Sequence, residues 1–127
     1  MSPPDTAHEL LALAEKDYKA ALILARAEEP QADAAGFHLQ QSVEKSLKAW
    51  LALKAVDYPR THDLSLLLGL LEDQDESIEP FWGLLELNPF AVQFRYELPG
   101  EDFPNFEPLA ELAERLLARV HSLLVSD

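Results

Sequence analysis

The chain has 127 residues, of which 48% are hydrophobic, and its 23 acidic residues against 10 basic ones give a formal net charge of −13. This length suits one domain with a single core, and the hydrophobic content predicts a folded chain rather than a disordered one. The negative charge argues against broad nucleic-acid binding, because that affinity comes mainly from lysine and arginine neutralising phosphates. The absence of cysteine excludes disulfides and thiolate chemistry.

The sequence also lacks the features of membrane and secreted proteins. No apolar run approaches the roughly 18 residues that a membrane span needs. The N-terminus has neither the basic start nor the apolar stretch of a secretory signal. We therefore expect a cytoplasmic protein that makes no contact with a membrane.

Two helices are predicted in the first half of the chain. The first starts at a capping box formed by Thr6 and Glu9 and runs to about residue 28, before Pro30 ends it. The second spans roughly 32–56 and carries an apolar stripe of leucine, valine and tryptophan. A break follows at Tyr58-Pro59, since the residue before proline avoids the helical region.

Three further segments are predicted after this break. A nearly all-leucine helix over about 63–71 should be deeply buried, and the acidic residues 72–76 form a solvated connector. A fourth helix covers about 78–87, after which Asn88-Pro89 is expected to cap a short turn. An irregular loop over 95–107 then leads into a last amphipathic helix at about 108–125. No segment alternates with period two, so the expected fold is all-α: an up-and-down antiparallel bundle of four to five helices in one domain, residues 1–127.

The second predicted helix gathers several polar chemistries on one side. At about 100° per residue, five polar residues fall within about 120° of one another, opposite the apolar stripe. They are His38, Gln41, Glu44, Lys45 and Lys48. From this pattern alone, the face is either a solvated surface with a Glu44–Lys48 pair or one wall of a binding site.

Three motifs in the same order resemble those of the HEPN family, the higher eukaryote and prokaryote nucleotide-binding domains. They read FHLQQSVEKSLKAW from residue 37, PRTHDLSLLL from residue 59 and NPFAVQFRYE from residue 88, with Glu97 where the family often has proline. The resemblance covers nearly the whole chain. It implies a four- or five-helix bundle, frequently a homodimer, with proposed nucleotide binding. It also implies a role beside a small nucleotidyltransferase or in a toxin–antitoxin-like pair, but does not by itself imply catalysis.

The leading hypothesis is a non-catalytic module that binds a nucleotide or another phosphate. Arginine suits phosphate through its bidentate fork and lysine acts as a point charge, while histidine and tyrosine add hydrogen bonds or stacking. The expected site combines the second helix with the two later motifs, and neither a metal nor a cofactor is expected in it. Its residues are His38, Gln41, Glu44, Lys45, Lys48, Arg60, His62, Arg95 and Tyr96.

Three alternatives remain open. The same polar residues could form a buried network that fixes helix packing or a dimer, because buried charges must be paired. Arg115 and His121 match the R-x(4–6)-H pattern of HEPN ribonucleases, although they lie about 120° apart around a helix. His38, His62-Asp63 and Asp102 could imitate the metal set of all-helical phosphohydrolases, although Asp63 also suits a helix cap.

Overall fold

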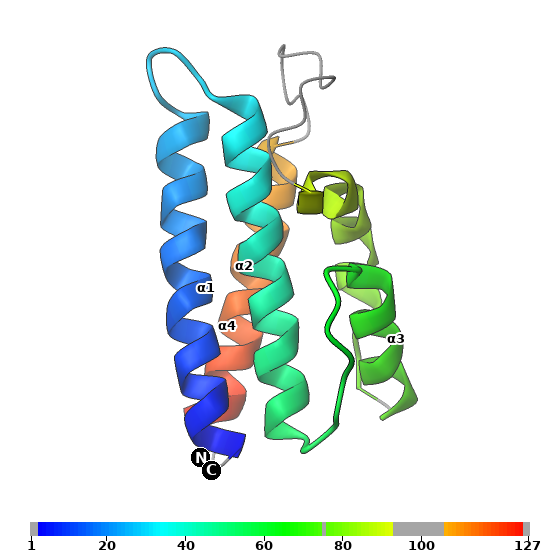
Figure 1. Cartoon of the computed structure of the whole chain (residues 1–127). Coiled ribbons are helices and arrows are strands. Elements are labelled where there is room, and N and C mark those ends of the chain that lie inside the picture. Colours follow the sequence, from blue (N-terminus) through cyan, green and yellow to red (C-terminus); the bar gives the residue numbers. More distant parts are fainter. Residues whose placement is uncertain (1–2, 75, 93–105, 126–127) are drawn as a thin grey trace.

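The structure is a computed structural model that describes residues 3–74, 76–92 and 106–125. These residues form helices and no strand, which confirms the predicted all-helical bundle (Figure 1). None of these helices is both long enough and apolar enough to span a membrane. In chain order, the elements are α1 (Pro3–Ala25), α2 (Ala32–Leu53), α3 (Leu64–Asp73), the 3-10 helix η1 (Glu79–Val92) and α4 (Phe106–Val125).

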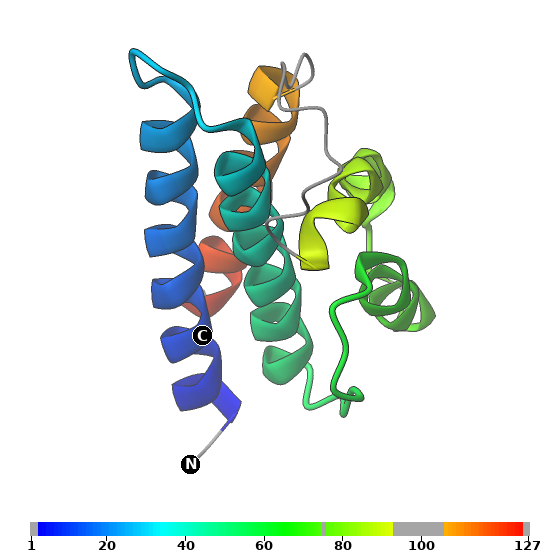
Figure 2. The ribbon, with the colours of Figure 1, turned by 45° about the horizontal axis from the view of Figure 1, so that its top comes forward.

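The central element of the bundle is α2. It contacts all four other elements, and its most extensive contact is with α1, which runs antiparallel beside it. α4 lies behind this pair in Figure 1, while α3 and η1 pack on the side of α2 away from α1, as the second view also shows (Figure 2). As a result, every residue of α2 is either buried or half-buried.

Small side chains recur along both α1 and α2. On each helix three of them are spaced seven residues apart, and all six are fully buried. Small residues let two helix backbones approach closely, which agrees with the extensive contact between α1 and α2. The residues are Ala7, Ala14 and Ala21 on α1, and Ala35, Ser42 and Ala49 on α2.

The segment after α3 corrects the predicted fourth helix. It is one 3-10 helix, η1, and it continues through Pro89 where a separate capped turn was expected. From the residue just before η1 onward, buried apolar side chains recur every three residues, at Ile78, Phe81, Leu84 and Leu87. This period matches the three residues per turn of a 3-10 helix, so the buried face forms a straight stripe against the bundle.

The predicted start of α1 is wrong. The helix begins at Pro3, so Thr6 and Glu9 lie inside it rather than at its cap. Proline is tolerated in the first turn because the amide it lacks would have no partner there. The same helix ends three residues before the predicted residue 28, where the backbone N–H of Gln31 donates to the carbonyl of Leu24 and the chain turns back.

The predicted end of α2 is also too late. Ala55 adopts a left-handed φ of 57°, and the N–H of Val56 donates to the Leu51 carbonyl at 3.0 Å. This bond pattern closes a helix C-terminus and normally uses glycine at the left-handed position. Alanine is a good helix former, so the sequence pattern does not indicate this stop.

Candidate functional site

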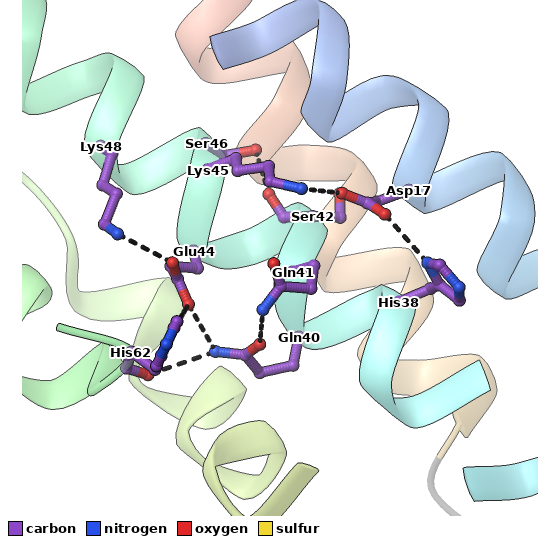
Figure 3. Close-up of polar contacts among 10 residues, drawn as sticks. All are labelled: Asp17, His38, Gln40, Gln41, Ser42, Glu44, Lys45, Ser46, Lys48 and His62. Carbon is purple, nitrogen blue, oxygen red and sulfur yellow. Dashed lines mark hydrogen bonds and ion pairs between the residues drawn. The ribbon is translucent and has the colours of Figure 1, made fainter. Parts of the chain in front are cut away.

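The polar face predicted on α2 exists, but its residues are divided between two neighbouring clusters. One cluster centres on Asp17 of α1 and the other on Glu44 of α2 (Figure 3). Each cluster joins α2 to a different part of the bundle. The two are described here as the Asp17 cluster (Asp17, His38 and Lys45) and the Glu44 cluster (Gln40, Glu44, Lys48 and His62).

The Asp17 cluster joins α1 to α2. Lys45 Nζ donates to Asp17 Oδ2 at 2.6 Å, and His38 Nδ1 lies 2.9 Å from Asp17 Oδ1. The side chain of Asp17 is only 14% exposed, so both of its oxygens are engaged in a largely desolvated position. Sequence reasoning missed Asp17, because it belongs to another helix and is an ordinary acid among many.

The Glu44 cluster joins α2 to the segment before α3. Lys48 Nζ donates to Glu44 Oε2 at 2.8 Å, while Glu44 Oε1 lies 3.0 Å from His62 Nδ1 and accepts from Gln40 Nε2 at 3.1 Å. The same Gln40 nitrogen donates to the His62 carbonyl at 3.2 Å. Gln41 donates to Gln40 Oε1 at 2.8 Å and so extends this cluster. Gln40, which sequence reasoning did not select, is fully buried at its centre.

The charge of Glu44 is maintained despite its burial. Burial by itself would raise the pKa of Glu44, but the hydrogen bonds from Lys48, His62 and Gln40 outweigh it, so the pKa lies below its ordinary value. Lys48 is held on a second side, because its Nζ lies 5.7 Å from the centroid of the Tyr58 ring. Lys48 is therefore already enclosed by protein groups and is not presented as a free cation.

Within the described part of the chain, no further predicted cation joins either cluster. Arg60 is exposed, and no side-chain partner for it is found within the described part of the chain. Arg95 and Tyr96, the expected contribution of the third motif, lie outside the described residues. Of the site residues predicted from the two later motifs, His62 is the one that the described part of the chain places against α2.

The N-terminus of α3 is closed by protein side chains. Asn88 Oδ1 accepts from the backbone N–H of Leu64 at 3.0 Å, and Asp63 Oδ1 accepts from that of Ser65 at 3.0 Å. Asn88 Nδ2 also donates to Asp63 Oδ1 at 3.1 Å. The pKa of Asp63 is lowered mainly by the hydrogen bond from the Ser65 hydroxyl, against burial, with further bonds from backbone amides and Asn88. The prediction that Asp63 caps this helix is confirmed, whereas Asn88 caps α3 and not the turn that follows it.

A groove lies beside this cap. Its volume is about 430 Å³, and it is lined by Thr61, His62, Asp63, Asn88 and Ala91. Because the amides that could hold a phosphate here are already bonded and Asp63 adds negative charge, the groove is poorly suited to an anion. His62, whose side chain is 64% exposed, is the residue that connects this groove to the Glu44 cluster.

The geometry does not favour either of the enzyme alternatives. His38 and His62 belong to different clusters, and no group of three potential metal ligands occurs among the described residues. Asp102, the last member of the imagined metal set, lies outside them. Arg115 and His121 are both exposed on α4, and the six positions that separate them turn their side chains about 120° apart around the helix. Of the two, only His121 lines the groove between α4 and α1.

Comparison with known proteins agrees with the three motifs. The sequence model of the HEPN domain matches residues 7–124, which is nearly the whole chain. No curated protein and no solved structure matches the sequence or the fold. Since the match includes all or most of every described helix and all three motifs, the chain belongs to the HEPN domain family.

Proposed function

We propose that this HEPN domain is a non-catalytic binding module that docks against another protein through one face of the α1–α2 pair. The observation that carries the proposal is that Lys45 and Lys48, the two cations predicted to hold phosphate on α2, are each bonded to a half-buried or buried carboxylate. A phosphate would have to compete with Asp17 and Glu44 for these ammonium groups. The Asp17 cluster instead gives this face a charge-balanced polar patch, which suits contact with a protein.

An apolar stripe on α1 continues this surface. Five residues follow one another at spacings of three and four along the helix, so they share one flank. Leu13 is 47% exposed, unusually open for a leucine, and three other members are half-buried apolar residues. The face is therefore defined by Leu10, Leu13, Asp17, Ala20 and Leu24 of α1, together with His38, Gln41 and Lys45 of α2.

The occupant that best suits this face is a second copy of the chain. Two chains of net charge −13 repel each other over most of their surfaces. On this face, however, the carboxylate of Asp17 is matched by Lys45. A two-fold contact brings the same patch of both copies together. A charge-balanced patch with an exposed leucine can pack against a second copy of itself in that way. A nucleotidyltransferase-like partner would use the same surface in a mixed complex.

Sedimentation of the purified chain tests this proposal. The unaltered chain is expected to be a dimer, and Leu13→Arg is expected to shift it to monomer by placing a charge in the contact. Leu66→Arg on α3, where the replaced leucine is 38% exposed, is the matched control and should leave the dimer intact. A chain that stays monomeric at all concentrations, or a Leu13→Arg variant that associates as well as the control, would overturn it.

The same proteins distinguish the nucleotide hypothesis. Calorimetric titration with ATP is expected to give no binding heat, because the lysines of α2 already have partners. Saturable binding that is lost in Lys48→Met, with folding intact, would favour a nucleotide site instead. Incubation with single-stranded RNA should leave the RNA intact, whereas cleavage that disappears in His121→Ala would establish a ribonuclease.

A further inference from the structure

A second groove lies on the other flank of α1, between α1 and α4. Its volume is about 400 Å³, and its lining comes only from these two helices. The apolar part consists of the Tyr18 ring, Leu117 and Ala118, and the rim carries Glu15 and Glu114 with Lys19 and His121. This groove shares no residue with the α1–α2 face, so a protein bound to that face would leave the groove open.

Two exposed glutamates, Glu15 and Glu114, lie on the rim of this groove, and the exposed Glu111 precedes Glu114 by three residues on α4. Among the described residues, no ion pair is found for any of these three carboxylates. By contrast, Glu107 at the start of α4 is satisfied by Arg26, with bonds of 2.7 and 3.1 Å. Lys19 is the one lysine or arginine in the described lining, so acidic groups outnumber it.

The hydroxyl of Tyr18 is affected by several of these acidic groups. Its pKa is raised first by burial and then by Glu114, with Glu107 and Glu111 adding to the effect and Arg26 opposing it. The ring is half-buried and packs against the core, so its position is fixed before anything binds. A cation held over such a ring gains from the aromatic face as well as from nearby carboxylates.

We propose that this α1–α4 groove receives an arginine side chain from a basic helical segment of a partner protein. The aliphatic stem of arginine would lie on Leu117 and Ala118, and its guanidinium would reach Tyr18 and the carboxylates of Glu15 and Glu114. A net charge of −13 adds long-range attraction for a basic segment. This lining complements a cation carried on an apolar stem. An acidic or neutral segment offers no such group.

The test uses the full chain and a synthetic amphipathic helical peptide with arginine along one face. A matched peptide carries citrulline, the neutral analogue of arginine, at the same positions. The arginine peptide is expected to bind and the citrulline peptide to bind at least about tenfold more weakly, since each charge-assisted contact changes affinity by about that factor. Equal binding of the two peptides, or no binding of either, overturns the proposal.

Variants then locate the site. Glu114→Gln and Tyr18→Leu are each expected to weaken the arginine peptide about tenfold, whereas Tyr18→Phe keeps the ring and should bind nearly as well as the unaltered chain. Glu72→Gln removes the same charge from α3, which contacts neither α1 nor α4, and should have little effect. Equal weakening by Glu72→Gln and Glu114→Gln would mean that only overall charge matters and would overturn the site. Circular dichroism confirms that each variant is folded, and Glu114→Gln, an exposed change, keeps the test valid if Tyr18→Leu does not fold.

Discussion

Removing the charge of Glu44 should destabilise the chain far more than removing an exposed carboxylate. Glu44 is 4% exposed and holds Lys48, whose side chain is 15% exposed, at 2.8 Å. Glu44→Gln keeps the shape but leaves the Lys48 ammonium without its counter-charge. Breaking a fully buried pair in this way costs about 3–5 kcal/mol, and the partial exposure of Lys48 reduces the expected loss to roughly 2–3 kcal/mol. At about 4 °C per kcal/mol for a domain of this size, the melting temperature should fall by roughly 8–12 °C.

Urea and thermal unfolding measure this loss, and a double variant isolates its cause. Glu44→Gln combined with Lys48→Met removes both charges and should recover about 1 kcal/mol or more of the single variant's loss. Glu107→Gln is the matched control, because its pair with Arg26 is exposed on both sides and is screened by water. If Glu44→Gln loses no more unfolding free energy than the Glu107→Gln control, then Lys48 is not held by Glu44 and is available to an anion.

The pH dependence of this stability has a definite sign. The pKa of Glu44 is lower in the folded chain than its ordinary value of 4.5, so its contribution is full above that value and disappears as the pH falls through the folded pKa. The difference in unfolding free energy between the unaltered chain and Glu44→Gln should therefore be largest near neutral pH and narrow in acid. A difference that grows on acidification would contradict the ionised, bonded state of Glu44.

Four other substitutions test helix packing and helix ends. A Cβ on Gly36 would overlap the Phe90 ring, so Gly36→Ala should cost about 1–3 kcal/mol of unfolding free energy. Gly69 has open space around it, so Gly69→Ala should gain about 0.5–1 kcal/mol. Asn88→Ala removes the acceptor of an α3 amide and should cost about 1 kcal/mol in urea unfolding. Ala55→Gly should gain about 0.5–1 kcal/mol by relieving the left-handed backbone, and a loss would show that the helix end is held otherwise.

Much of the fold follows from local sequence patterns. The apolar stripe of α2 and the leucines of α3 predict both helices and the side that each buries. The spacing of Ile78, Phe81 and Leu84 also indicates a 3-10 helix, although a period of three is easily read as an α-helical stripe with one position shifted. Helix ends were harder to predict, because the stop at Ala55 depends on a strained backbone that its residue type does not indicate.

The site was less predictable than the fold because its partners come from elsewhere in the chain. Periodicity gathers Glu44, Lys45 and Lys48 on one helix, but it cannot show that Asp17, 28 residues before Lys45, neutralises one of the lysines. It likewise cannot show that Gln40 turns inward and links Glu44 to His62. The two lysines of α2 that suggest a phosphate site in the sequence are, in three dimensions, already members of ion pairs.

The most direct test of this pairing is the response of α2 to a phosphate ligand. An isotope-labelled chain is titrated with millimolar ATP while the amide signals of His38 to Lys48 are followed by NMR. Because Asp17 and Glu44 already hold Lys45 and Lys48, these signals should remain unchanged. Saturable shifts centred on this stretch and abolished by Lys48→Met would mean that the lysines serve a nucleotide, and the protein-docking role of the α1–α2 face would be wrong.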